Sequence, residues 1–428
     1  MANKLFPESW AHTPACEYCD SVRDGTHDTP KPLDEGYPLV TSKFLRNGKV
    51  HVEEAYYISK EDFDAINARS KVEPWDVLMS MIGTIGELAI VREEPEYAIK
   101  NIALFKCGNP LKAEWLYYVL SSPQGRALLK SAERGTTQKF ISLQQLRLMK
   151  IPVPPPSTMA AITEILSTID AKIEHNNELI KMLEEQAQLV YDYWFMQFDF
   201  PDENEKPYRS SGGKMVWNDK LKREIPEGWK IAGIDRFLTL TRGVSYKPTD
   251  ASDIPTPMHT CILRANNIDF GTIRWDGLVY VKTERVNQKT QRLKENDIVI
   301  VMSSGSKEHV GKTATAWGDL DCSYGAFCAK ITPHEQCTSY VRTSLRSSTF
   351  RAFLKKQLLA TNINNISLSV LANYIVPEPT YNVLERFQQI TGEIYTRCNT
   401  LHAEIYELTK QRDFLLPLLM SGQVKVAE

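Results

Sequence analysis

Two long stretches of the chain, residues 157–197 and 380–428, carry apolar residues in steps of three, four or seven. This spacing places an apolar stripe along one side of a helix, with charged residues such as Glu164 and Lys172 turned away from it. No Gly or Pro interrupts residues 157–197, which would form a helix about 60 Å long. Two such helices can bury their stripes against each other as an antiparallel coiled coil. The predicted seam consists of Ile162, Ile165, Ile169, Ile173, Ile180, Leu183, Val190, Phe387, Ile390, Ile394, Ile405, Leu408 and Leu415.

The rest of the chain repeats with a period of about 225 residues. Pro7-Glu8-Ser9-Trp10 returns as Pro226-Glu227-Gly228-Trp229, and the strand-like run 39–45 matches the run 262–268. Because the motifs keep their order, the sequence predicts a duplicated unit, in which a globular domain is followed by one long helix.

Within each globular domain, short β-branched and aromatic runs bounded by Gly, Pro and Asn predict strands of a mixed or antiparallel sheet. Two amphipathic segments, Ala113–Ala132 and Thr338–Leu359, predict helices. The expected fold class is therefore α/β (α+β), with two similar globular domains and two paired long helices. The expected boundaries are 1–156 for the first domain, 157–197 for the first long helix, 198–224 for a linker, 225–379 for the second domain and 380–428 for the second long helix and C-terminal tail.

Composition is ordinary for a globular protein, with 42% hydrophobic and 24% charged residues. We find neither a signal-peptide pattern nor an apolar run long enough for a membrane span, so we expect a cytoplasmic protein without membrane contact. Eight cysteines are too sparse for a disulfide scaffold. Cys16 and Cys19 form a CxxC that His27 alone does not complete, and we therefore predict no metal site.

The formal net charge of −2 argues against a generally basic surface, yet the charge is unevenly distributed. Residues 226–379 contain 19 Lys/Arg and 14 Asp/Glu, a net charge of +5, whereas residues 1–156 contain 19 and 20, a net charge of −1. If DNA is the partner, binding by the two domains should depend differently on salt.

The stretch from Gly305 to Lys312 is similar to a phosphate-binding P-loop, but it has five residues between its glycines where the P-loop has four. The repeat also places Glu87 opposite Lys312. Residues 202–206 superficially match a nuclease motif but are too compressed to arrange carboxylates around a metal. The catalytic and cofactor motifs of an adenine methyltransferase are missing from the sequence, and we predict no catalytic residue.

Three pairs of polar loops occupy matching places in the two domains: 23–31 with 242–247, 83–86 with 303–307, and 135–139 with 361–365. Hydroxyl groups and glycine amides suit phosphate oxygens, and Asn, Gln, Arg and Lys suit base edges. The alternative is that these loops are solvated turns. With neighbouring polar positions, the candidate DNA-binding residues are Arg23, Asp24, Gly25, Thr26, His27, Lys31, Lys43, Thr84, Gln138, Lys139, Arg242, Ser245, Tyr246, Lys247, Arg264, Asn266, Asn267, Ser304, Ser306, Lys307, Asn362 and Asn364.

Over nearly its whole length the chain resembles the specificity subunit of type I restriction–modification enzymes. The resemblance rests on the duplicated Pro-Glu-x-Trp openings and on the order of several further motifs. These are Asp24-Gly25-Thr26-His27, Gly135-Thr136-Thr137-Gln138 with Ile141-Ser142, Ile151-Pro152-Val153-Pro154, Ile165-Leu166 with Ile169-Asp170, and Phe198-Asp199-Phe200-Pro201. The second copy departs from the first, since Ala360 stands at the place of Gly135 and Val244-Ser245 at that of Thr26-His27.

The resemblance implies two target-recognition domains, each reading one half of a split site in double-stranded DNA. It implies that the paired helices act as a spacer and as the docking surface for two DNA methyltransferase subunits. S-adenosylmethionine and ATP would then be bound by the methyltransferase and restriction/translocase subunits, and no cofactor by this chain. Two alternatives stay open: a self-contained DNA-modifying enzyme, and a coiled-coil interaction protein not tied to DNA.

Overall fold

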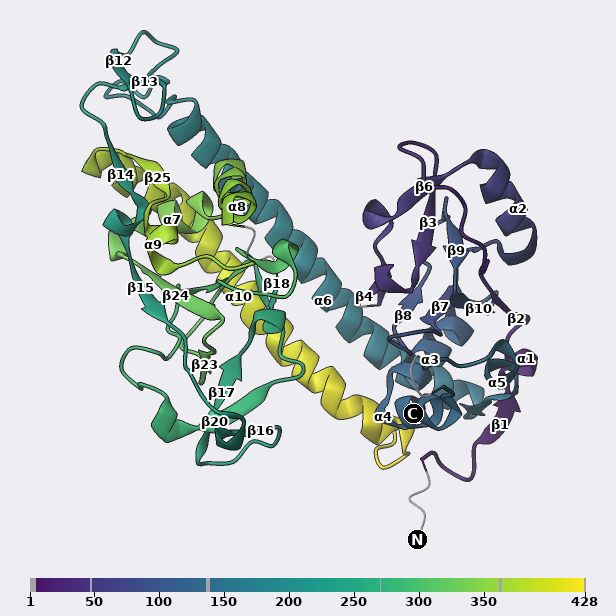
Figure 1. Cartoon of the computed structure of the whole chain (residues 1–428). Helices are drawn as coiled ribbons and strands as arrows, with labels where there is room; N and C mark the ends of the chain where they lie inside the picture. Colours follow the sequence, from purple (N-terminus) through teal and green to yellow (C-terminus); the bar gives the residue numbers. More distant parts are fainter. Residues whose placement is uncertain (1–4, 47, 136–138, 270, 362–363, 427–428) are drawn as a thin grey trace. The chain divides into compact units, whose positions relative to one another are not determined.

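The computed structural model describes residues 5–46, 48–135, 139–269, 271–361 and 364–426. It mixes helices and strands, and the chain divides into two compact units. Unit 1 comprises Met1–Ile173 and Glu407–Glu428, and unit 2 comprises Glu174–Tyr406. Both boundaries fall inside the long helices α6 (Pro156–Tyr191) and α10 (Tyr381–Met420) (Figure 1). None of the described helices is both long and apolar enough to cross a membrane.

Unit 1 is built around a four-stranded antiparallel sheet with the order β2-β10-β7-β8. Beside it lies the sheet β6-β3-β9, in which β3 and β9 are parallel. Its strands are β1 (Ala11–Pro14), β2 (Ser21–Asp24), β3 (Tyr37–Thr41), β4 (Leu45–Arg46), β5 (Lys49–Val50), β6 (Tyr56–Ile58), β7 (Asp76–Ser80), β8 (Leu88–Ile90), β9 (Ala98–Lys100), β10 (Ile102–Lys106) and β11 (Lys150–Val153). Its helices besides the long ones are α1 (Ala15–Tyr18), α2 (Lys60–Ser70), α3 (Pro110–Ser121), α4 (Pro123–Ala132) and α5 (Leu143–Leu148).

Unit 2 repeats this architecture. Its antiparallel sheet β15-β24-β21-β22 matches β2-β10-β7-β8, and β20-β17-β23, again with one parallel pair, matches β6-β3-β9. Its strands are β12 (Met215–Asn218), β13 (Arg223–Pro226), β14 (Lys230–Gly233), β15 (Leu238–Arg242), β16 (Ala251–Ser252), β17 (His259–Leu263), β18 (Ile268–Asp269), β19 (Thr272–Ile273), β20 (Val279–Lys282), β21 (Ile298–Val301), β22 (Thr313–Thr315), β23 (Cys322–Tyr324), β24 (Cys328–Pro333) and β25 (Ile375–Glu378). Its further helices are α7 (Thr338–Ser344), α8 (Ser348–Thr361) and α9 (Leu368–Ala372).

The central strand of each unit is buried on both faces. In β7, Val77 and Met79 belong to one apolar core and Leu78 to another, because successive side chains point to opposite faces. In β21, Ile298 and Ile300 likewise belong to one apolar core, and Val299 and Val301 belong to another. Such strands form continuous apolar runs in the sequence, and every residue of β7 and of β21 is buried.

Four expected elements are broken in the structure. Residues 113–132 form two helices, because Ser122 caps α4 and Pro123 occupies its first turn. Residues 338–359 likewise divide into α7 and α8. The run expected as a strand at 39–45 ends at Thr41 and continues as a 3-10 turn, and the matching run 262–268 does the same after Leu263.

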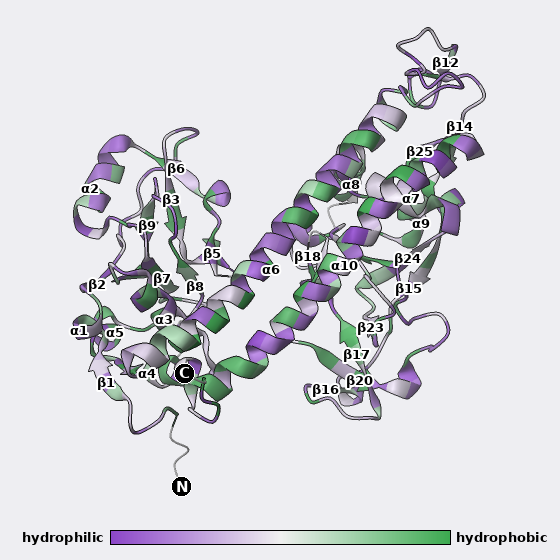
Figure 2. Cartoon of the chain, turned by 180° about the vertical axis from the view of Figure 1, so that it is seen from behind, coloured by the Kyte–Doolittle hydropathy of each residue, from purple (hydrophilic) through white to green (hydrophobic). Residues whose placement is uncertain are grey.

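Within each unit, α6 and α10 contact each other in antiparallel order. In unit 1, Met159 and Ile162 pack in the same core as Leu419 and Met420, and Asp170 pairs with Arg412. In unit 2, Asn176 donates to Glu404 at 2.8 Å, Ile180 packs with Cys398 and Leu401, and Tyr191 packs with Phe387. Figure 2 shows both helices as amphipathic.

One predicted seam residue lies outside this contact. Ile390 is 48% exposed, whereas Thr391 is fully buried. The buried face runs through Phe387, Thr391 and Tyr395 in steps of four, and Ile390 lies about 100° around the helix from Thr391, beyond the edge of the contact. Ile165 is likewise only half-buried, and Leu166 beside it is fully buried.

The segment 198–224, expected as a linker, packs onto unit 2. Phe198 and Phe200 are buried in its core, and both rings contact Trp229. Residues 215–218 form β12, which pairs with β13. The Gly- and Ser-rich residues 210–213 therefore form part of a tight turn. In this turn Gly213 lies so close to Tyr208 that a side chain at position 213 would not fit.

Candidate nucleic-acid interface

Two of the three polar loops of unit 1 leave the same end of its central sheet. Asp24 at the end of β2 pairs with Ala103, and Ser80 at the end of β7 pairs with Ile102. The loops that follow these strands are therefore neighbours. The third loop joins them, because the Gly83 amide donates to the Lys139 carbonyl at 3.2 Å.

Unit 2 brings its three loops together in the same way. Arg242 of β15 pairs with Ala329, and Val301 of β21 pairs with Cys328, so the loops after β15 and β21 leave one sheet end. The Ser304 amide donates to the Asn364 carbonyl at 3.2 Å, and Asn364 Nδ2 donates to the Gly305 carbonyl at 3.0 Å. Each unit thus presents one polar surface at one end of its central sheet.

The first loop of unit 1 is held by its side chains. The exposed His27 ring lies between Asn101 Oδ1, at 2.7 Å from Nδ1, and Asp24 Oδ2, at 3.1 Å from Nε2. Glycine is required at position 25 because a Cβ there would lie 2.3 Å from the Ile99 carbonyl oxygen. Thr26 is 8% exposed, and its hydroxyl accepts the Asp28 amide, so we assign it a structural role.

Two arginines that the sequence did not single out border this loop. Arg69 at the end of α2 donates to the Gly25 carbonyl at 2.8 Å, and Arg147 of α5 donates to the Val22 carbonyl at 3.0 Å. With Arg23 they line a pocket of about 430 Å³. Three guanidinium groups around one pocket suit phosphate oxygens or a guanine edge. The three arginines come together through contacts between segments more than 40 residues apart in the sequence. Nothing in the sequence indicated these contacts.

The other candidate residues differ in their accessibility. Asn267 is 1% exposed, and its Nδ2 donates to the carbonyls of Arg274 and Asp276, so it ties a hairpin together and cannot reach a base edge. Arg264, half-buried, donates to the Gly277 carbonyl at 2.7 Å. Exposed candidates are Arg23, Lys31, Lys43, Thr84, Lys139, Arg242, Ser245, Lys247, Asn266 and Lys307, and half-buried ones are Tyr246, Ser304, Ser306 and Asn364. Gln138 and Asn362 lie outside the described residues.

The stretch similar to a P-loop uses its lysine for an internal contact. Lys312 Nζ lies 2.8 Å from Asp269 Oδ1, and the Lys312 side chain is 12% exposed. A lysine held in this way is directed away from the solvent-exposed loop. The geometry therefore supports the prediction that this stretch does not bind a nucleotide phosphate.

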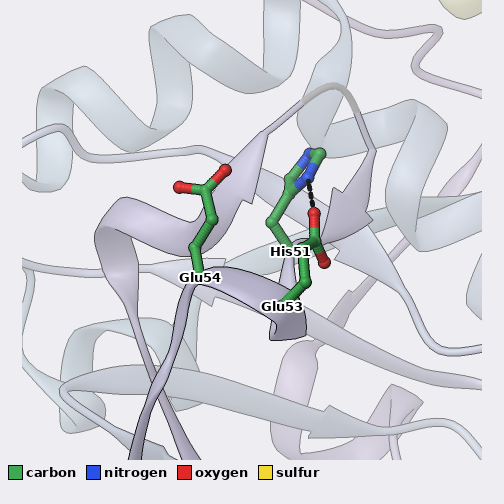
Figure 3. A group of neighbouring side chains, drawn as sticks. All are labelled: His51, Glu53 and Glu54. Carbon is green, nitrogen blue, oxygen red and sulfur yellow. Dashed lines mark hydrogen bonds and ion pairs between the residues drawn. The ribbon is translucent and has the colours of Figure 1, made fainter. Parts of the chain in front are cut away.

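One group of potential metal ligands, His51, Glu53 and Glu54, occurs among the described residues of unit 1 (Figure 3). His51 Nδ1 lies 2.9 Å from Glu53 Oε1, and both oxygens of Glu54 accept hydrogen bonds from Arg46. With Glu54 engaged by a cation, only two ligands of different residues are available, which is too few for a specific site. Cys16 is exposed and Cys19 is buried, so the CxxC does not present two thiols to one ion.

Comparison with known proteins connects this geometry to a family. Residues 28–185 match the family model described as the type I restriction modification DNA specificity domain. Residues 28–185 are therefore similar to a type I specificity domain. The resemblance inferred from the motifs is thereby confirmed, and the matched residues include the first long helix up to Glu185 as well as most of the first globular domain.

Individual relatives agree. Over 209 residues the chain is 34% identical to the StySPI specificity subunit of Salmonella potsdam, covering 48% of this chain and 45% of that one. Over 198 residues it is 34% identical to the EcoKI specificity subunit of Escherichia coli K12, covering 46% and 41%. These matches span less than half the length of either relative. The S subunit of a type I restriction–modification system from M. genitalium shares the fold, with a TM-score of 0.52, 15% identity and 98% coverage of each chain.

Proposed function

We propose that this chain is the DNA-sequence-specificity subunit of a type I restriction–modification complex. It binds a bipartite target in double-stranded DNA and catalyses no reaction itself. The observation that carries the proposal is the repeated sheet end, at which three polar loops meet in unit 1 and again in unit 2. Two equivalent binding surfaces in one chain suit two separate half-sites.

The two globular domains act as target-recognition domains, and α6 and α10 pair as an antiparallel coiled coil that separates them. The antiparallel order of the helix contacts inside each unit supports this arrangement. Two DNA methyltransferase subunits dock on the helices and bind S-adenosylmethionine, and restriction/translocase subunits bind ATP. The chain itself positions the DNA: hydroxyl groups and glycine amides contact phosphate oxygens, and Asn, Gln, Arg and Lys side chains contact base edges.

Co-purification of the chain with its methyltransferase subunits, followed by mapping of methylated adenines in host DNA, tests the proposal. The expected result is one split motif, with two short specific sequences separated by unspecified bases. Turnover of S-adenosylmethionine by the chain alone would instead indicate a self-contained enzyme. Binding to DNA without any sequence dependence would contradict a specificity function.

A further inference from the structure

An aromatic side chain is exposed at the sheet end of unit 2 that carries the polar loops. Phe327 lies in the turn between β23 and β24, and 68% of it is exposed to solvent. The next residue, Cys328, pairs with Val301 at the end of β21. The phenylalanine therefore stands beside the second polar loop, in the middle of the surface that we propose binds DNA.

The backbone of this turn is fixed by hydrogen bonds. The Cys328 amide donates to the Gly325 carbonyl at 2.8 Å, which closes a four-residue turn with Phe327 at its third position. The Phe327 carbonyl accepts the amides of Met302 at 2.8 Å and Ser303 at 3.2 Å. A ring attached to such a turn loses little backbone freedom on binding, so it is preorganised for contact.

The first polar loop supports the turn from the other side. A Cβ at Gly243 would lie 2.1 Å from the Gly325 carbonyl oxygen, so only glycine allows the two backbones to approach this closely. The Gly325 amide in turn donates to the Leu263 carbonyl at 2.9 Å. The turn is therefore part of the folded sheet end and presents its ring from a rigid base.

The surroundings of the ring indicate the kind of partner. The neighbouring loops carry the exposed cations Arg242, Lys247 and Lys307 and the polar side chains of Ser304 and Asn364. An apolar ring among cations and hydrogen-bonding groups is complementary to a polymer with an anionic outside and an apolar, stacked interior. A protein partner would favour a contiguous apolar patch instead.

We propose that Phe327 inserts between base pairs of the half-site bound by unit 2 and unstacks one base step. The inference rests on the proposed function and adds a distortion of the DNA to it. Apolar side chains that wedge into base steps kink the duplex, and flexible steps deform most easily. Phe327 would thus contribute to specificity at a step without a hydrogen bond to its bases.

The two half-sites should differ in this respect. In unit 1 the equivalent turn between β9 and β10 consists of Asn101, whose Oδ1 lies 2.7 Å from His27 Nδ1. An amide engaged with a neighbouring ring is no apolar wedge. We therefore expect the unstacked step in one half of the target only.

The test uses the full chain with its methyltransferase subunits and duplexes selected by that complex from a randomised pool. 2-Aminopurine replaces one base at a time across both half-sites, since its fluorescence rises when it is unstacked. We expect a rise at one step of one half-site with the wild-type complex. Phe327→Ala should abolish the rise and weaken binding by about 10- to 100-fold, and Phe327→Leu should retain most of the rise.

Met258→Ala is the matched control, because Met258 is 74% exposed but precedes β17 at the end opposite Arg264. It should leave fluorescence and affinity unchanged. Unaltered fluorescence and affinity in Phe327→Ala would overturn the role of Phe327 while leaving the proposed function intact. If Phe327→Ala weakened binding but kept the full fluorescence rise, Phe327 would not be the group that unstacks the base step, and the proposed insertion would be overturned. A wild-type complex that selects no common sequence would overturn both the role and the proposed function.

Discussion

The two units build the same sheets but attach them to the long helices through different polar contacts. In unit 1, Tyr118 donates to Asp170 at 2.9 Å, and Asp170 also pairs with Arg412 at 3.0 Å. Burial, together with the charge of Asp170, raises the pKa of Tyr118, so its phenol stays protonated and donates. At the matching place in unit 2, Thr343 and Tyr395 share a neutral hydrogen bond.

The charges of unit 2 lie elsewhere. Glu184 of α6 pairs with Arg346 at 2.6 Å and approaches Arg342 at 3.6 Å, and Glu184 and Arg342 are both less than 10% exposed. The backbone contacts, by contrast, are shared, because Trp115 donates to the Pro152 carbonyl and Tyr340 to the Pro377 carbonyl. The duplicated packing thus keeps the same main-chain hydrogen-bond acceptors, while the charged side chains that contact the long helices differ between the two units.

The largest effect is expected from exchanging one globular domain. Replacing residues 226–379 by the matching segment of a relative should change one half of the methylated motif completely and leave the other half as it was. The reason is that the core of each unit is complete without the other. Mapping of methylated adenines before and after the exchange gives the answer, and a change in both halves would disprove independent reading.

Lengthening the helices should alter the spacing of the half-sites. Asp170–Arg412 and Asn176–Glu404 show that the matching insertion points are after Ile173 and after Glu407. Seven residues inserted at each point keep the heptad register and add about 10 Å of helix, or about three base pairs of DNA. Selection of duplexes from a pool with randomised spacer length should yield longer spacers with the same half-sites. Four-residue insertions, which break the register, serve as the control; an unchanged spacer preference at full affinity would mean that the helices do not set the distance.

Removing the charge of Glu184 in unit 2 should cost more stability than removing the charge of Asp170 in unit 1. Glu184→Gln leaves Arg342, which is 2% exposed, without a countercharge, and we expect a loss of about 3–5 kcal/mol in the free energy of unfolding. Asp170→Asn affects a pair that is 22% and 29% exposed, with an expected loss of about 1 kcal/mol. Urea denaturation of both variants measures the difference. Equal losses would show that burial does not distinguish the two pairs.

Acid should destabilise unit 2 through one histidine. Burial, helped by the charges of Arg342 and Arg346, lowers the pKa of His402 to about 3, against about 6.5 when unfolded. Between these values the unfolded chain binds the additional proton, so stability falls as the pH falls, by about 2 kcal/mol at pH 5. His402→Gln should reduce the loss between pH 7 and pH 5 in urea titrations. The same pH dependence in His402→Gln as in the wild type would refute the assignment.

The smallest effect is expected at Lys312. Because its ammonium group pairs with Asp269, Lys312→Ala should leave the ATP-dependent activity of the assembled complex nearly unchanged. Translocation or ATP hydrolysis by the complex is the measurement, with the exposed Lys307→Ala as a comparison. Cross-linking of an ATP analogue to Lys312 would contradict the expectation.

Periodicity and the order of duplicated motifs were sufficient to predict the long helices and the existence of two similar modules. Local breaks were harder, since the cap at Ser122 and Pro123 interrupts an apolar pattern that alone reads as one helix. The polar loops were found because their chemistry is visible in the sequence. Arg69, the burial of Asn267 and the exposed Phe327 depend on contacts between distant segments, which neither composition nor spacing records.

The loops at each sheet end are joined largely through main-chain atoms, such as the Gly83 amide with the Lys139 carbonyl and the Ser304 amide with the Asn364 carbonyl. Every residue except proline can make such bonds, whatever its side chain. Apart from positions such as Gly25 and Gly243, where a side chain does not fit, the loops can therefore change residues without loss of these bonds. Under the proposed function, stability and target choice would then evolve as separate traits. Under that proposal, a change of target through the other loop positions would pass through folded intermediates.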